Sequence, residues 1–277
     1  YNLSINGIRQ SFGFNVGDSW NKVTKFEGYE QISKSDEIER IIRVGLPLYS
    51  YYGYKTDGLF KNEDDIRNSA LPVGILPQPG DVKYKDRNGD GIIDDNDRYV
   101  LGNAFPRLTF GFSYDVQWKG FDLNMLWQGV GKRDMALRGE TIEPFHSGYS
   151  FVMFEHQLDY WTPANPDAKW PRLTPQGNAS TVNNYGKGSD FNIFDGRYIR
   201  LKNIQIGYTL PKTLTKRIGM SKLRVFVDGQ NLLTFSKNSF VDPESTEFGG
   251  NMNASGANSA RNYPLLKYIG GGFNVEF

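Results

Sequence analysis

The sequence contains no cysteine and only two histidines, His146 and His156, among its 277 residues. Without cysteine the chain forms no disulfide, thiol nucleophile or cysteine-ligated zinc site. The two histidines are too few and too badly spaced for most histidine metal sites. No stretch approaches the roughly 18 apolar residues that a transmembrane helix requires. The net charge of +1 gives no indication of nucleic-acid binding or of a polybasic membrane contact.

Signatures of catalysis are also missing. The sequence holds no GxSxG motif, no HExxH motif and no cysteine–histidine set. A glycosidase needs only two carboxylates at a suitable separation, which a sequence does not reveal. We expect that the chain is not an enzyme and name no catalytic residue, and a glycoside-active domain stays open as an alternative.

The segment KDRNGDGIIDDNDR, residues 85–98, has the spacing of a calcium loop. Oxygen-bearing side chains recur at alternating positions, a glycine stands at loop position 6, and a backbone carbonyl is available at position 7, as in an EF-hand. The predicted metal ligands are Asp86, Asn88, Asp90, the carbonyl of Ile92, Asp94 and Asp97.

The closing residue of this loop is one methylene shorter than the usual glutamate, and no second loop of the kind occurs in the chain. Calcium sensors usually pair such loops, so we expect a single structural calcium ion. The alternative is a solvated acidic turn without metal, because Asn, Asp and Gly are ordinary turn residues.

Apolar and polar residues alternate in several segments. In residues 107–118, aromatic and aliphatic side chains occupy one face and Thr, Gly, Ser, Asp and Gln the other. A period of two over this length predicts a strand with one apolar and one polar face. After a turn at Lys119-Gly120 the pattern resumes, which predicts a hairpin whose strands have the roughly 9–11 residues of a tilted membrane strand.

Similar segments lie at residues 198–210, 223–235 and 268–277, with further plausible strands at 1–5, 11–20 and 46–60, so about eight strands result. Gly270-Gly271-Gly272 is interpreted as strand positions without side chains, since no Walker lysine accompanies it. The polar side chains expected on one common face are Asp115, Asp122, Asn124, Gln128, Gln205 and Gln230. A soluble β-sandwich with one buried face would alternate in the same way.

The connections between these strands are unequal in length. Residues 58–105, 132–196 and 236–262 are long, polar and rich in Gly, Asn, Pro and Ser, whereas the turn at Lys119-Gly120 is minimal. If strands run alternately up and down, the three long connections lie at one end, as in outer-membrane barrels. Compact soluble domains rarely carry such loops. The sequence therefore predicts an all-β fold, an antiparallel transmembrane β-barrel with long extracellular loops.

Five stretches, in order, resemble the C-terminal part of SusC/RagA-type TonB-dependent transporters, the outer-membrane importers of Bacteroidetes. They are residues 42–62, 80–134, 158–173, 197–212 and 223–235, and together they span most of the chain after about residue 40. Within the third stretch, Trp161 and Trp170 could stack on sugar rings, but the resemblance favours a packed loop motif.

The resemblance implies a barrel of about 22 strands around a plugged lumen. Residues 1–277 would supply its C-terminal portion, and the plug domain, with the segment that TonB grips, would be absent from this sequence. It also implies energised import of oligosaccharides or peptides in the bacterial outer membrane. The implied partners are a SusD-like surface lipoprotein, TonB, the remaining barrel and plug, and membrane lipid, with no nucleic acid. No substrate-binding residue is named.

If the last strand ends in the periplasm, counting strands back places the calcium loop outside the cell. There it would hold a long external loop in one shape. The competing interpretation of the whole chain is a soluble, calcium-stabilised carbohydrate-binding module or a glycoside-active domain.

Overall fold

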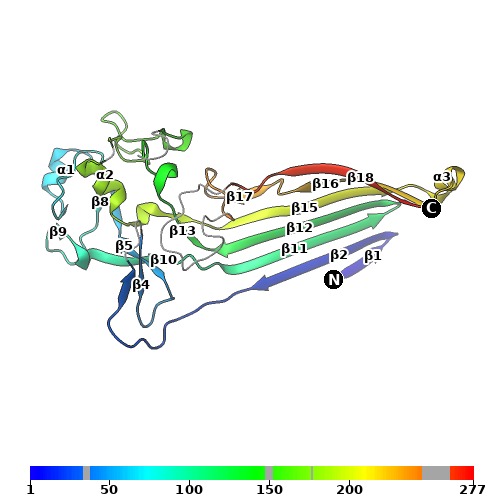
Figure 1. Ribbon diagram of the computed structural model, residues 1–277, viewed down its shortest axis with the longest axis horizontal. Coiled ribbons are helices and arrows are strands. Elements are labelled where there is room, and N and C mark those ends of the chain that lie inside the picture. The colour runs from blue at the N-terminus through cyan, green and yellow to red at the C-terminus, as the bar shows by residue number, and fades with distance from the viewer. Residues whose placement is uncertain (34–37, 147–151, 176, 245–262) are drawn as a thin grey trace.

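The structure, a computed structural model, describes residues 1–33, 38–146, 152–175, 177–244 and 263–277. Two parts follow one another along its long axis (Figure 1). One is a sheet of long strands, here called the long sheet. The other, here called the loop cap, is a cluster of short strands, short helices and loops at one end of that sheet.

The long sheet has eight strands, all paired antiparallel, in the order β1-β2-β11-β12-β15-β16-β18, with β17 paired to β15. For β1-β2 and β11-β12, antiparallel pairing follows from the short turns, which return the chain directly beside the preceding strand. The bounds are β1 Asn2–Ile5, β2 Ile8–Gly17, β11 Arg107–Trp118, β12 Phe121–Lys132, β15 Tyr198–Thr209, β16 Lys222–Gln230, β17 Thr234–Ser236 and β18 Tyr268–Glu276.

Tight turns close two hairpins at the end of the long sheet away from the loop cap. Asn6-Gly7 joins β1 to β2, Lys119-Gly120 joins β11 to β12, and all four residues have positive φ. Two-residue turns of this kind match the right-handed twist of the strands, and glycine adopts positive φ without steric cost. The predicted hairpin at Lys119-Gly120 is confirmed. The connection between β15 and β16 also lies at this end and contains α3 (Lys212–Thr215).

The three long connections all leave the opposite end of the long sheet and build the loop cap (Figure 1). They comprise residues 18–106, 133–197 and 231–267. Much of the predicted third connection, residues 245–262, lies outside the described residues.

The first connection begins at residue 18, so the expectation that it begins at residue 58 is wrong. The segment 46–60 forms β5 and β6 of the loop cap and no strand of the long sheet. All of β5 is buried, Tyr51, Tyr52 and Tyr54 included. Its tyrosines pack inside the loop cap.

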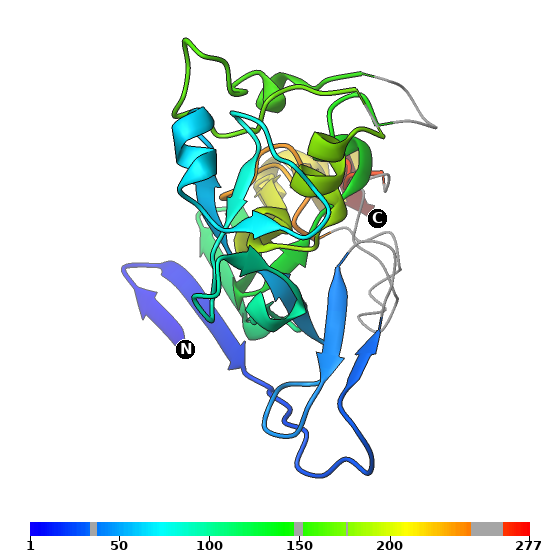
Figure 2. The same cartoon turned by 90° about the vertical axis from the view of Figure 1, so that its left-hand side faces the viewer.

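The loop cap holds a four-stranded sheet in the order β10-β5-β4-β3 and three two-stranded pairs, β13-β14, β6-β8 and β7-β9. Figure 2 views this part end-on. Its elements are β3 Gln31–Ser33, β4 Glu39–Ile42, β5 Ser50–Tyr54, β6 Thr56–Leu59, α1 Glu63–Arg67, β7 Leu71–Pro72, β8 Val82–Tyr84, β9 Ile92–Ile93, β10 Arg98–Gly102, β13 Asp134–Ala136, α2 Ala179–Thr181 and β14 Ile193–Asp195.

Most of the buried apolar side chains lie in the loop cap, where they form three clusters. One contains Leu137, Ile142 and Trp170, all at most 1% exposed. The loop cap therefore has hydrophobic cores of its own, while the long sheet is a single layer. Within the described ranges, no helix is long and apolar enough to cross a membrane.

Candidate functional site

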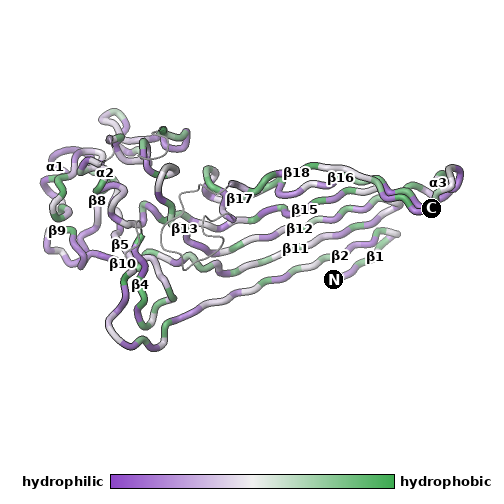
Figure 3. The backbone as a smooth tube through the Cα atoms, in the orientation of Figure 1, coloured by the Kyte–Doolittle hydropathy of each residue, from purple (hydrophilic) through white to green (hydrophobic). Residues whose placement is uncertain are grey.

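The strand register sorts the side chains of the long sheet into an apolar and a polar face. Across neighbouring strands, Phe112 pairs with Phe14 and Trp127, as Val225 pairs with Phe273. Along each strand the hydropathy alternates (Figure 3). The apolar face carries Phe12, Phe14, Phe110, Phe112, Val116, Leu123, Met125, Trp127, Ile204, Ile206, Val225, Val227, Ile269, Phe273 and Val275.

This apolar face is open. Phe14 is 69% exposed, Ile206 54% and Phe273 72%, on strands that lie far apart in the sheet. Soluble monomers rarely expose a contiguous apolar patch of more than a few hundred Å². The face therefore requires an apolar environment, from either hydrocarbon or another protein layer.

Aromatic side chains gather where the apolar face ends at the tight turns. Trp118 and Phe121 flank the Lys119-Gly120 turn, and the rings of Phe121 and Tyr208 lie 4.5 Å apart. Tyrosine and tryptophan favour the boundary between hydrocarbon and water, because one end of each ring system is polar.

The polar face carries the six side chains that the sequence assigns to one common face. Asp115, Asn124, Gln205 and Asp228 form one row across four strands. Asn124 donates a hydrogen bond to Asp115, and Arg224 donates to Gln205 at 2.8 Å. A groove of about 500 Å³ near the tight turns is lined by Asp115 and Asn124 of this row. The opposed chemistry of the two faces is as predicted.

Glycines on β18 make room for aromatic rings on the polar face. A Cβ atom at Gly270 would lie 2.5 Å from the Tyr268 hydroxyl, and one at Gly272 would lie 2.8 Å from the Phe226 ring. The rings of Tyr268 and Phe226 therefore pack on the backbone of Gly270 and Gly272. The interpretation of these glycines as strand positions is confirmed.

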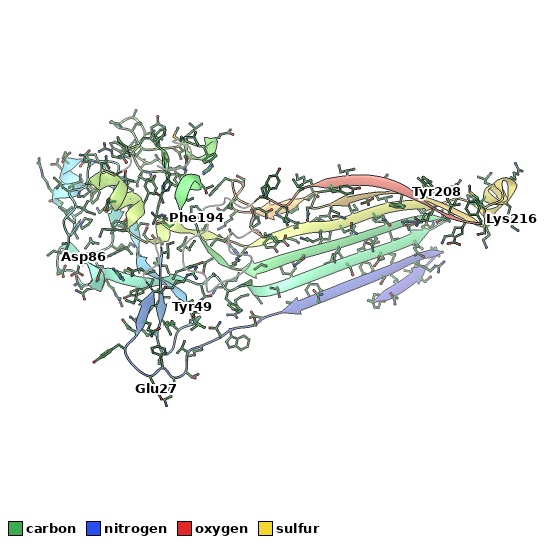
Figure 4. The ribbon with its side chains drawn as sticks, viewed as in Figure 1. Glu27, Tyr49, Asp86, Phe194, Tyr208 and Lys216 are labelled. Carbon is green, nitrogen blue, oxygen red and sulfur yellow. The ribbon has the colours of Figure 1, made fainter. Side chains whose placement is uncertain are left out.

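The six predicted metal ligands lie in one tight loop between β8 and β10, in the loop cap (Figure 4, Asp86). Gly89 and Gly91 take φ of 78° and 82°, which lets the backbone turn inward. The carboxylate of Asp86 accepts hydrogen bonds from Gly89 N at 2.6 Å and Gly91 N at 2.8 Å. These bonds, chiefly the one from Gly91, hold the pKa of Asp86 below its usual value.

Asp97 closes the loop from inside. Its side chain is fully buried, and its two oxygens accept from Arg87 N at 2.7 Å and Asp94 N at 2.9 Å. The neighbouring Arg98 forms ion pairs with Glu39 and Asp95, which tie the loop to the four-stranded sheet.

The donor set of this loop suits calcium in ligand type and order, because calcium prefers carboxylate and carbonyl oxygens. The carboxylates nevertheless do not converge. Across the described chain, no group of three or more His, Asp or Glu side chains is arranged to hold a metal ion. The carboxylate of Asp90 instead accepts from the Asn88 amide at 2.8 Å and that of Asp94 from the Asn96 amide at 3.1 Å.

A buried ion-pair cluster at the base of the third connection has no motif in the sequence. Arg200 on β15 is 3% exposed and donates to Asp242 and Glu244, each at 2.7 Å. Asp242 also accepts from Leu265 N at 2.9 Å. Burial alone would raise the pKa of Asp242, but the hydrogen bonds from Glu244 N, Arg200 and Leu265 N lower it. One carboxylate therefore links Leu265 to Asp242 and both to β15.

The two tryptophans of residues 158–173 are packing residues. Trp170 is 1% exposed and donates from Nε1 to the carbonyl of His156 at 2.6 Å. Trp161 lies against the backbone of Gly80, where a Cβ atom would be 2.4 Å from its ring. The predicted packed loop is confirmed.

Comparison with known proteins gives consistent relatives. No protein-family model matches the chain. TonB-dependent receptor P26 of Formosa agariphila is 32% identical over 90% of the chain, and receptor P3 of the same organism is 28% identical over the whole of this chain. TonB-dependent receptor SusC of Bacteroides thetaiotaomicron is 23% identical over 83%. The chain spans about a quarter of the length of these relatives, 27%, 24% and 22% for P3, P26 and SusC.

Solved structures agree in fold. The RagAB peptide transporter matches the whole chain with a TM-score of 0.70 at 21% identity, and the open-open RagAB peptide importer with 0.68 at 20%. The chain covers 28% and 27% of those chains. The relatives are receptors and importers rather than enzymes, as expected. By sequence and by fold, the chain is a relative of SusC/RagA-type TonB-dependent receptors and corresponds to a segment of their β-barrel.

Proposed function

We propose that the chain forms part of the barrel wall and the external loops of a TonB-dependent importer integral to the bacterial outer membrane. The observation that carries this proposal is the open apolar face of the long sheet opposite a polar, hydrogen-bonded face. A barrel wall needs this division, because its outside meets hydrocarbon and its inside meets water or protein.

Strand length supports a membrane span. β11 and β12 have 12 residues each, and at about 3.4 Å per residue they extend about 40 Å. A tilt of roughly 45° reduces this span to about 29 Å, close to the hydrocarbon thickness of a bilayer. The aromatic side chains near the tight turns then lie at the membrane–water boundary.

The proposed orientation has the tight turns in the periplasm and the loop cap outside the cell, since outer-membrane barrels have short periplasmic turns and long external loops. On this basis the loop cap belongs to the surface that meets a SusD-like lipoprotein and the incoming ligand. TonB would act through other parts of the full receptor. The expected ligand is an oligosaccharide or a peptide, and the naming of RagAB as a peptide importer supports a peptide.

We also propose one structural calcium ion in the loop Asp86–Asp97. Support comes from the order of its oxygen donors and from the two glycines with positive φ. A divalent cation would neutralise carboxylates that otherwise repel one another. The ligands would be those predicted from the sequence.

Fractionation of cells that produce the full receptor tests the membrane location. We expect the receptor in the outer-membrane fraction, released by detergent and migrating differently on unheated and heated gels. A soluble, calcium-stabilised carbohydrate-binding module would instead stay folded and monodisperse in detergent-free buffer, and that result would refute the proposal.

A further inference from the structure

The end of the long sheet that carries the tight turns is rich in cations without acidic partners. Residues 207–227 contain no Asp or Glu. Among the described side chains, Lys119, Lys212, Lys216 and Arg217 form no ion pair with a carboxylate, and all four are exposed.

Two of the cations on the strands at this end have acidic partners. Lys222 pairs with Glu276 at 3.0 Å, and Arg224 donates to Asp122 at 3.0 Å. Lys119, Lys212, Lys216 and Arg217 lie instead in the connections beyond the strands, and no ion pair joins them to a carboxylate among the described residues. Their charge is available to a partner outside the described chain.

These cations lie next to the aromatic boundary of the apolar face. Lys119 Nζ is 5.2 Å from the centre of the Trp118 ring. Tyr208 and Lys216 occupy the same end of the molecule, opposite Asp86 (Figure 4). Leu214, between Lys212 and Lys216, is 51% exposed. An apolar side chain among cations, just past an aromatic belt, has the composition of a segment at a membrane surface.

The backbone holds this basic segment in place. Thr215 is fully buried, and its carbonyl accepts a hydrogen bond from Met220 N at 3.1 Å. Lys212 and Lys216 are four residues apart in a helical stretch, where like charges repel. A negatively charged partner would remove this repulsion.

We propose that Lys119, Lys212, Lys216 and Arg217 bind the phosphate groups of anionic phospholipids in the leaflet next to the tight turns. This inference rests on the proposed membrane location. The headgroup region begins where the aromatic belt ends, so the cations would lie at phosphate depth. Each Lys or Arg near an anionic membrane surface strengthens the attraction to that surface by a factor of roughly five.

The test uses the full receptor in nanodiscs of phosphatidylcholine with phosphatidylglycerol as the minor lipid. Native mass spectrometry measures the ratio of the two lipids that remain bound. We expect phosphatidylglycerol to be enriched around the wild-type receptor. The triple variant Lys212→Gln, Lys216→Gln and Arg217→Gln should lower this enrichment by ten-fold or more, because three charges are removed.

A matched control removes three exposed positive charges near the loop cap that form no ion pair with a carboxylate among the described residues, with Lys22→Gln, Lys169→Gln and Lys267→Gln. The control variant should retain the enrichment. Equal enrichment in the triple variant and the wild type, or equal loss in the control, would overturn the inference while leaving the membrane location standing. Failure of the receptor to enter nanodiscs would overturn both.

Discussion

Loss of the Arg200 ion pairs should release the base of the third connection. In Arg200→Met, the carboxylates of Asp242 and Glu244 lose a buried guanidinium that is 3% exposed. Removal of one partner of a buried ion pair costs about 3–5 kcal/mol when the other charge stays buried. This applies to Asp242, because Glu244 is more exposed and keeps its ion pair with Lys202 at 2.9 Å. The hydrogen bonds from Glu244 N and Leu265 N remain, so the loss should be local.

Hydrogen exchange of the full receptor in detergent measures this release. A cost of about 3–5 kcal/mol predicts faster exchange in residues 231–244 by about two to three and a half orders of magnitude, unless wider unfolding limits the rate. Arg197→Met is the matched control. Arg197 is also paired with a carboxylate, Asp195, but its side chain is 53% exposed. An exposed pair contributes about 0–1 kcal/mol, so exchange should change at most several-fold.

The same cluster should respond to acid in a defined direction. The pKa of Asp242 is lowered in the folded state, so its stabilisation is complete above the unfolded value of about 3.9. It is lost as the pH falls through the folded pKa. Exchange in residues 231–244 should therefore be constant near neutral pH, after correction for intrinsic rates, and rise in strong acid. The assigned role of the cluster would be refuted if residues 231–244 exchanged at the wild-type rate in Arg200→Met. It would also be refuted if Arg197→Met accelerated their exchange as much as Arg200→Met does.

Three further outcomes follow from the described geometry. Val227→Lys, on the apolar face, should destabilise the folded barrel by about 2–4 kcal/mol and so lower the heat-modifiable fraction on gels. The adjacent Asp228→Lys, on the polar face, should leave this fraction nearly unchanged. Gly80→Ala should destabilise the loop cap, because φ is +89° and the new Cβ would meet Trp161, and tryptophan fluorescence should shift at lower denaturant. Calcium should protect the loop Asp86–Asp97 from cleavage by protease, and chelation or Asp90→Ala should remove this protection. Identical cleavage with and without calcium would contradict the metal proposal.

Local patterns were sufficient to predict the long sheet. In β11 and β12 every second residue is apolar, and Lys119-Gly120 is a turn sequence, so strand, face and hairpin follow from neighbours in the chain. The loop cap is different because its contacts are distant in sequence. Asn184 donates to Asp81 across 103 residues, and Arg200 reaches Asp242 across 42. No periodicity marks such pairs.

The segment 46–60 illustrates the same limit. Its tyrosines and glycines resemble a barrel strand, yet their burial depends on the other connections that cover them. The structure of the calcium loop could be predicted from the sequence only in part. Its turn and its donor order follow from spacing, whereas the complete burial of Asp97 depends on how the loop packs on the cap.

The single-layer construction of the long sheet has a practical consequence. In the described chain, β1 and β18 each have one side without a strand partner, and the apolar face between them is uncovered. Unprotected edges of this kind recruit other strands and promote aggregation. Recombinant production of this segment alone should therefore yield inclusion bodies, and soluble display of the loop cap would call for grafting it onto a closed scaffold.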